Sequence, residues 1–100
     1  MGIGGGEVRE DEKWLLQQLY LEDLKKPEHF NIEDLFSPIT YKMPRDIIEG
    51  QTRYNHKRLW YLMEKFVNKD IADYGTSLAT AWLTDKGKAI GWALVEGEML

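Results

Sequence analysis

The stretch RYNHKRLWYLMEKF, residues 53–66, combines side chains that can bind phosphate with the spacing of an α-helix. Arg53, Asn55, His56, Lys57 and Arg58 carry positive charge or can donate a hydrogen bond to a phosphate oxygen. A helix that begins at residue 56 would place these side chains beside its unpaired backbone N–H groups and the positive end of its dipole. The pattern therefore predicts the binding of a polyanion through the start of one helix.

Charge is unevenly distributed along the 100 residues, whose net charge is −4. Residues 1–40 carry 4 basic and 9 acidic side chains, residues 41–69 carry 7 basic and 3 acidic, and residues 70–100 carry 2 basic and 5 acidic. The middle segment thus has a net charge of +4. A polyanion responds to charges within about 8–10 Å, so this local excess matters more than the total. The middle segment is the candidate binding face.

Other kinds of site find little support in the composition. The chain has no cysteine and only two histidines, His29 and His56, which lack the spacing of metal ligands, so we expect no metal and no other cofactor. Acidic pairs such as Glu22-Asp23 would diverge on a helix, which argues against a catalytic acid–base pair and against an enzyme. The sequence has no run of about 18 apolar residues and no signal-like N-terminus, which predicts a cytoplasmic protein.

Hydrophobic periodicity predicts the elements that position this face. Residues 1–6 are expected to be flexible because four of them are glycine, and residues 7–100 are expected to form one domain. The expected order is a helix at 7–25, a helical turn after Asn31, a short strand at 39–41, a short helix from Pro44, a helix at 56–67 capped by Asn55, a hairpin with its turn at 74–77, and a helix at about 85–96.

Each expected element has a side that should face the core. Leu59, Leu62, Met63 and Phe66 form one apolar stripe on the helix at 56–67. The other inward residues are Trp14, Leu15, Leu16, Leu19 and Tyr20 of the first helix, and Ala89, Ile90, Ala93 and Leu94 of the last helix. In the second hairpin strand, Leu78, Thr80 and Trp82 share one face, and Ala79, Ala81 and Leu83 share the other. The spacing of Gly87 and Gly91 favours close packing of the last helix on its neighbour over a dimer contact.

Two segments carry a resemblance to a known family. IEGQTRYNHKRLWYLMEKF resembles the helix-turn-helix of prokaryotic winged-helix transcriptional regulators, with Ile48, Tyr54, Leu59 and Leu62 at the core positions. WLTDKGKAI is similar to the end of the wing and the start of the last helix in that family, and a looser likeness is to archaeal phage-repressor-type winged helices. The sequence departs from the family at Arg53, where glycine is usual, and in DIADYG, which lacks the usual basic residue at the wing tip.

The resemblance implies an α+β, mostly helical fold. This winged helix-turn-helix would have a three-helix core, with the helix-turn-helix at about 44–67, a β-hairpin wing at about 68–84 and an extra C-terminal helix at about 85–96. It also implies a sequence-specific double-stranded DNA-binding transcriptional regulator, such as a repressor, of archaeal or viral type.

We expect this regulator to act as a homodimer through its first and last helices, with the helix at 56–67 in the major groove. The candidate groove residues are His56, Lys57, Arg58 and Tyr61, and the candidates for contacts with the DNA backbone are Arg53, Lys42, Arg45 and Lys65. Asn55 is expected to cap the helix and to hydrogen-bond a phosphate.

A second function stays open, because winged-helix domains also serve as protein–protein interaction modules without DNA binding. In that case the aromatic residues Trp60, Tyr61 and Trp92 would anchor a partner. The two hypotheses differ in their electrostatics. A positive stripe on the helix at 56–67 that no carboxylate neutralises favours DNA, whereas cover by Asp46, Glu49 or the acidic first helix favours the interaction module. The sequence indicates no pocket for a small-molecule ligand.

Overall fold

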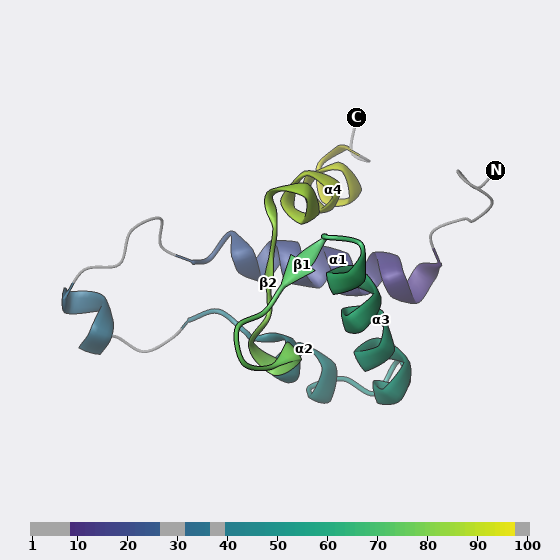
Figure 1. Cartoon of the computed structure of the whole chain (residues 1–100), viewed down its shortest axis with the longest axis horizontal. Coiled ribbons are helices and arrows are strands. Elements are labelled where there is room, and N and C mark those ends of the chain that lie inside the picture. Colours follow the sequence, from purple (N-terminus) through teal and green to yellow (C-terminus); the bar gives the residue numbers. More distant parts are fainter. Residues whose placement is uncertain (1–8, 27–31, 37–39, 98–100) are drawn as a thin grey trace.

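The computed structural model describes residues 9–26, 32–36 and 40–97. Its elements, in chain order, are α1 (Glu10–Asp23), the 3-10 helix η1 (Ile32–Phe36), α2 (Pro44–Glu49), α3 (His56–Asn68), β1 (Ala72–Asp73), the 3-10 helix η2 (Leu78–Thr80), β2 (Trp82–Leu83) and α4 (Asp85–Val95). Figure 1 shows α1 between α4 on one side and α2 and α3 on the other. Over the described residues the fold is a small, mostly helical α+β domain, as predicted.

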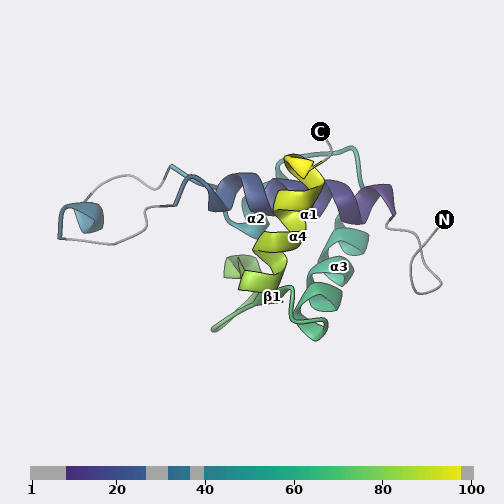
Figure 2. The same ribbon diagram turned by 90° about the horizontal axis from the view of Figure 1, so that it is seen from above.

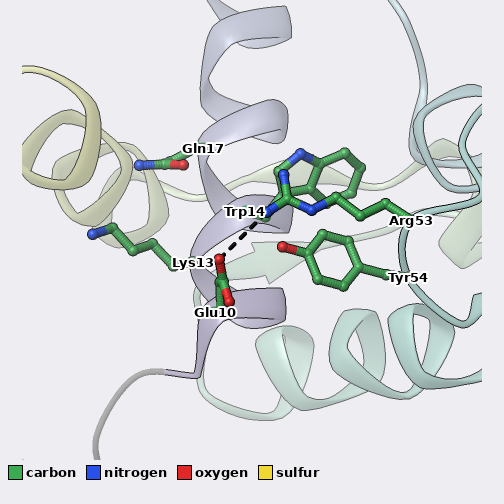
Figure 3. Close-up of a pocket in the computed structure, with 6 residues that line it drawn as sticks. All are labelled: Glu10, Lys13, Trp14, Gln17, Arg53 and Tyr54. Atoms are coloured by element: carbon green, nitrogen blue, oxygen red, sulfur yellow. Dashed lines mark hydrogen bonds and ion pairs between the residues drawn. The ribbon is translucent and has the colours of Figure 1, made fainter.

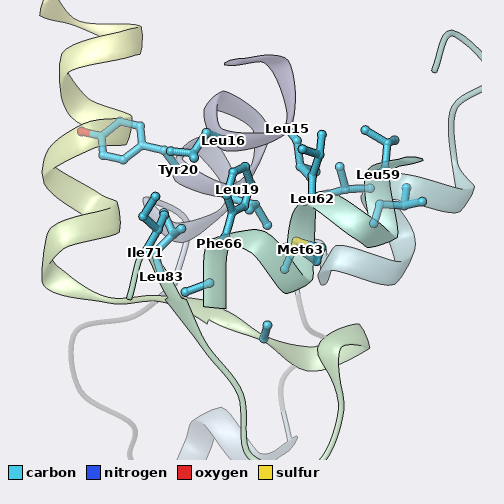
Figure 4. Packing of buried hydrophobic residues seen from close by; sticks show 14 residues of the cluster. Leu15, Leu16, Leu19, Tyr20, Leu59, Leu62, Met63, Phe66, Ile71 and Leu83 are labelled. Carbon is cyan, nitrogen blue, oxygen red and sulfur yellow. The ribbon is translucent and has the colours of Figure 1, made fainter. Parts of the chain in front are cut away.

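The core lies where α1 meets α3. Leu59, Leu62, Met63 and Phe66 of α3 are all buried, which confirms the predicted stripe. They pack with the buried hydrophobic residues of α1, which are Leu15, Leu16, Leu19 and Tyr20 (Figure 4). The predicted inward face of α1 is therefore confirmed, with Trp14 only partly buried at its edge. Since each large aliphatic side chain contributes about 1.5–3 kcal/mol on burial, this contact is a major source of stability.

The segment between α1 and α2 differs from its prediction. A helical turn does form at Ile32–Phe36, although the expected cap, Asn31, lies outside the described residues. The expected strand at 39–41 is wrong at Thr40 and Tyr41, which are not in a strand, and residue 39 lies outside the described residues. Just after it, the backbone N–H of Lys42 donates to the Glu22 carboxylate of α1, at 2.7 Å, rather than to a neighbouring strand.

The hairpin is shorter than predicted. β1 and β2 pair antiparallel, with Ala72 opposite Leu83 and Asp73 opposite Trp82. Residues 78–80, expected to be strand, form η2 instead, because the Ser77 side chain accepts a hydrogen bond from the Ala79 N–H at 3.0 Å and so begins a helical turn. The predicted alternation of faces is nevertheless confirmed: Ala79, Ala81 and Leu83 are buried, whereas Thr80 and Trp82 are exposed.

α4 packs through its glycines. A Cβ atom at Gly87 would lie 2.0 Å from the Ile71 carbonyl oxygen, and one at Gly91 would lie 2.6 Å from the Tyr20 Cβ. The predicted close packing is therefore confirmed, and Figure 2 shows α4 crossing α1. The predicted inward face is wrong at Ala89 and Ala93, which are exposed, because the close approach at the two glycines turns them outward.

Candidate functional site

The turn between α2 and α3 is held by one side chain, that of Gln51. Its amide nitrogen donates to the carbonyl oxygens of Ile48 (3.0 Å) and Tyr54 (3.1 Å), and its amide oxygen accepts from the Tyr54 N–H at 2.8 Å. This network holds the turn with Arg53 at the position where winged-helix regulators usually carry glycine. Among the described residues, Asp70 is the only non-glycine with a positive φ, so Arg53 needs no left-handed backbone.

The start of α3 is capped as predicted. The Asn55 side-chain oxygen accepts a hydrogen bond from the Arg58 N–H at 3.0 Å. His56 is exposed, and its Nε2 lies 2.8 Å from the Gln51 carbonyl oxygen, which accepts its hydrogen bond. Lys57 is also exposed and makes no ion pair with a described residue. Further along the outer side of α3, Tyr61 is 54% exposed and lies beneath the Arg58 guanidinium, 5.3 Å from it.

Most of the basic side chains around α3 are bound by the first turn of α1. We call Glu10, Asp11 and Glu12 the acidic turn. Arg58 Nε lies 3.0 Å from Asp11 Oδ2, and Lys65 Nζ lies 2.8 Å from Glu12 Oε1. Arg58 also approaches Glu12 at 3.7 Å. Consecutive carboxylates of one helical turn thus hold two cations that stand two turns apart on α3.

These two ion pairs are partly buried, so solvent screens them less and each contributes more to the stability of the fold. The side chains of Asp11 and Glu12 are 12% and 13% exposed, and those of Arg58 and Lys65 are 30% and 31% exposed. Burial alone would raise the pKa of Asp11, but the hydrogen bond and positive charge of Arg58 outweigh it and lower the pKa below its usual value. The hydrogen bond to Asp11 in turn raises the pKa of Arg58.

A third pair, between Arg53 and Glu10, is exposed and weaker. Arg53 Nη2 lies 3.3 Å from Glu10 Oε1, with both side chains largely in solvent. Exposed ion pairs of this kind contribute at most about 1 kcal/mol to the free energy of unfolding. Arg53 also lies over the ring of Tyr54, 5.1 Å from its centre. All three pairs join α1 to α3 or to the turn before it, so the acidic turn fixes the orientation of α3 and neutralises three of its neighbouring cations.

The pairs change the local charge that the sequence predicted. Three of the seven basic residues in 41–69 are bound by carboxylates from outside that segment, so its net charge of +4 falls to +1 when the acidic turn is included. The exposed residues along the outer side of α3 include Lys57, Tyr61, Glu64 and Asn68, which carry no net charge. α3 therefore presents no continuous positive stripe.

The remaining candidates, Lys42 and Arg45, are brought near α2 rather than onto α3. Both are exposed, and neither side chain forms an ion pair within the part of the chain that the structure describes. Arg45 belongs to the first turn of α2, and Lys42 lies two residues before that helix. They remain available to a partner, as His56 and Lys57 are.

Beside the acidic turn is a shallow cavity of about 270 Å³ (Figure 3). Its lining residues are Glu10, Lys13, Trp14, Gln17, Arg53 and Tyr54. The rings of Trp14 and Tyr54 lie 5.2 Å apart, and the Tyr54 hydroxyl is buried with no hydrogen-bond partner among the described residues. Tyr54 therefore packs on the core, as expected, at the point where α1 meets the turn.

Sequence reasoning named the acidic first helix among the elements that would favour the interaction module by covering the basic residues, but it identified neither the pairs that form nor the role of Gln51. The helix dipole favours carboxylates in any first turn, so acidic residues at the start of α1 do not by themselves predict ion pairs with α3. The signal that could have found them is the match between three consecutive acidic residues and the excess of basic residues at 53–65. Gln51 carries no sequence signal, because its role depends on the geometry of the turn.

Comparison with known proteins finds no match: no family model fits the chain, and no curated protein or solved structure is significantly similar to it. None of the described helices has the length and apolar character needed to cross a membrane. Within the described residues, no three histidine, aspartate or glutamate side chains are grouped so that they could hold a metal ion.

Proposed function

We propose that this chain is a winged helix-turn-helix domain that acts in the cytoplasm as a protein–protein interaction module. The element order supports the winged-helix assignment: a first helix, two helices joined by a short turn, a hairpin, and a last helix. The capped start of α3 and its buried stripe agree with it as well. The wing is short, since each strand has only two residues.

The observation that carries the functional proposal is the binding of Arg58 and Lys65 by Asp11 and Glu12. DNA would have to compete with carboxylates that are already within hydrogen-bond distance and partly shielded from water. Affinity for duplex DNA comes mainly from phosphate contacts by free cations. The chain has a net charge of −4, and residues 41–69 together with the acidic turn have a net charge of only +1. The electrostatic attraction between this surface and a phosphate backbone is therefore weak.

Exposed aromatic side chains offer anchors for a protein partner. Tyr61 on α3 is 54% exposed and Trp92 on α4 is 50% exposed, as the interaction hypothesis expects. The third expected anchor, Trp60, is partly buried against the core and is less suited to the role. Trp82 and Tyr74 of the hairpin are further exposed aromatics. Aromatic residues are frequent hot spots in interfaces because they bury a large area with few rotatable bonds.

The first partner that we propose is a second copy of the chain, which would form a homodimer through the first and last helices. Trp92 is flanked on the exposed side of α4 by Ala89 and Ala93, so a large side chain stands beside two small ones. In a two-fold arrangement, the Trp92 of each copy could pack over the alanines of the other. Leu21 and Leu24 of α1 are also exposed and would extend the surface.

Duplex DNA is the second candidate partner, and one observation favours it. His56 and Lys57 are exposed at the capped N-terminus of α3, with Tyr61 one turn further on. Lys42 and Arg45 would supply backbone contacts. In this case the protein would be a transcriptional regulator with a smaller contact set than the sequence predicts. Arg53, Arg58 and Lys65 would then orient α3 instead of contacting phosphate.

A titration of labelled random-sequence duplex at several salt concentrations separates the two candidates. The proteins compared are the wild type, the double variant Arg45→Ala, Lys57→Ala, and the control Lys88→Ala, which removes an exposed lysine from α4. The interaction module predicts no binding at ~50 mM salt, where non-specific contacts are strong. Suppose instead that the wild type binds and that the log–log salt slope of the double variant is shallower by up to ~2. Duplex DNA then replaces a protein as the proposed partner.

A further inference from the structure

An apolar cavity of about 200 Å³ lies between α1, α3 and α4, on a different side of α1 from the helix-turn-helix turn. Its floor is formed by Leu16 of α1, Phe66 of α3 and Ile71, and Ile90 and Leu94 of α4 form its wall. Figure 4 shows Leu16, Phe66 and Ile71 among the side chains that lie between α4 and α3. The sequence gives no indication of this cavity, because three separate elements enclose it.

The packing of α4 explains why the cavity stays open. Gly87 and Gly91 bring one side of α4 against Ile71 and Tyr20. The next side of the helix carries Ile90 and Leu94, which pack on the core but remain only partly buried. An apolar ligand in the cavity would cover these two side chains, and the burial of apolar surface favours binding.

The rim of the cavity is polar and mostly cationic. Lys65 of α3 and Lys69, the C-cap of that helix, stand one helical turn apart, and Glu12 is the third rim residue. Lys65 is bound to Glu12 at 2.8 Å, whereas Lys69 is exposed and makes no ion pair with a described residue. The carbonyl oxygen of Lys69 accepts from Lys86 Nζ, and that of Phe66 accepts from the Ile71 N–H, which reduces the negative potential at this end of α3.

We propose that this cavity binds a small monocarboxylate whose body is a single ring or a short aliphatic chain. A cavity of about 150 Å³ holds benzene, and drug-sized ligands need about 300 Å³ or more. The observed volume therefore fits one ring with one charged group. The ring would lie against Leu16, Phe66 and Ile71, and the carboxylate would lie at the rim between Lys65 and Lys69.

Charge complementarity selects a carboxylate over a neutral or cationic group. Lys69 offers an ammonium group that no described carboxylate pairs, at the mouth of an apolar cavity, and Lys65 offers a second one that is shared with Glu12. A ligand carboxylate would compete with Glu12 for Lys65, so the Glu12 charge opposes binding. The two rim charges of opposite sign therefore predict opposite effects when each is removed.

The test uses benzoate as the probe and benzamide as its neutral counterpart, with the full chain labelled for two-dimensional NMR. Benzoate is expected to shift the amide resonances of Phe66, Ile71, Ile90 and Leu94 in a saturable manner, with a dissociation constant on the order of 1 mM for so small a ligand. Benzamide is expected to bind more weakly. Equal binding of both compounds, or no saturable shifts with benzoate at these residues, would overturn the proposal.

Variants of the rim test the role of each charge. Lys69→Gln should weaken benzoate binding by about threefold to fivefold, the effect of one partly solvated charge pair. Glu12→Gln should tighten it by a similar factor, because the competing carboxylate is removed. Lys57→Gln, on the same helix but away from the cavity, should leave binding unchanged. If Lys69→Gln has no effect, or if Glu12→Gln weakens binding, the carboxylate is not recognised at this rim. Neither result depends on whether the protein binds DNA or another protein.

Discussion

The Nε atom of Arg58 lies 3.0 Å from Oδ2 of Asp11, although 47 residues separate them in sequence. This contact joins the first turn of α1 to the first turn of α3, and the Lys65–Glu12 pair continues it two turns further on. The sequence predicts that α3 binds a polyanion. In the structure, carboxylates of the same chain form ion pairs with two cations along one side of this helix.

The Asp11–Arg58 pair is expected to stabilise the fold, because both side chains are partly buried. A double-mutant cycle with Asp11→Asn and Arg58→Gln should give a coupling free energy of about 1 kcal/mol in urea unfolding. The matched control is the cycle of Glu10→Gln with Arg53→Gln, whose side chains are largely in solvent. That control should give a coupling of only about 0.2 kcal/mol. Equal couplings for the two cycles would show that burial adds nothing to the first pair.

Stability should fall in acid. The pKa of Glu22 is lowered, because its hydrogen bonds from the Lys42 N–H and Lys25 outweigh the effect of burial, and the pKa of Asp11 is lowered by Arg58 in the same way. A carboxyl group with a lowered folded-state pKa stabilises the fold above its unfolded value, which is about 4, and that stabilisation is lost as the pH falls through the folded-state value.

Urea unfolding of the wild type and of Glu22→Gln at several pH values tests this expectation. The variant should be less stable at neutral pH, and its stability should decline less between roughly pH 5 and pH 2. Glu64→Gln, which removes an exposed carboxylate from α3, controls for the loss of charge alone. Parallel declines in the wild type and Glu22→Gln would contradict the assigned hydrogen bonds.

Replacing Gly91 by alanine should destabilise the protein. Alanine is the better helix former by about 1 kcal/mol, but its Cβ would lie 2.6 Å from the Tyr20 Cβ, so α4 would have to move away from α1. Overpacking of this kind typically costs about 1–3 kcal/mol. Gly97→Ala is the control, because the nearest atom to its new Cβ would be 3.8 Å away. A thermal melt in which Gly91→Ala is as stable as Gly97→Ala would refute the close contact.

Removal of Trp92 from the outer side of α4 should abolish the proposed self-association. Trp92→Glu places a charge on the surface where two copies would meet, so sedimentation analysis should show a monomer for the variant and a dimer for the wild type. Trp82→Glu, on the hairpin, is the matched control and should remain dimeric. Both variants should keep the native fold by circular dichroism, since both tryptophans are exposed. A wild type that is monomeric at every accessible concentration would remove the homodimer from the proposal.

Much of the fold could be predicted because local signals and packing agree in it. The stripe from Leu59 to Phe66 has helical spacing and is buried, and the Asn55 cap stands where the sequence places it. The inward face of α4 could not be predicted from hydrophobicity. The close packing of Gly87 and Gly91 decides which side of the helix faces the core, and it leaves Ala89 and Ala93 exposed. The strand expected at 39–41 failed at Thr40 and Tyr41, since the backbone directly after them bonds to the Glu22 side chain rather than to another strand.

The candidate site was less predictable, because its electrostatics depend on contacts between distant segments. Periodicity places Lys57, Arg58 and Lys65 on the polar side of a helix, but it cannot say which of them face solvent. Two of the three bind the acidic turn, and only Lys57 stays free of ion pairs among the described residues. No local rule relates residues 10–12 to residues 53–65, whose proximity follows from the packing of α1 on α3.

The most direct test of this account measures duplex binding before and after the acidic turn is neutralised. The triple variant Glu10→Gln, Asp11→Asn, Glu12→Gln keeps the size of each side chain and frees Arg53, Arg58 and Lys65. The wild type should not bind duplex at ~50 mM salt, whereas the variant should bind with a log–log salt slope near −3, about 0.9 per freed cation. Tight binding by the wild type that weakens in Arg58→Gln would contradict it, because Arg58 would then contact phosphate rather than Asp11.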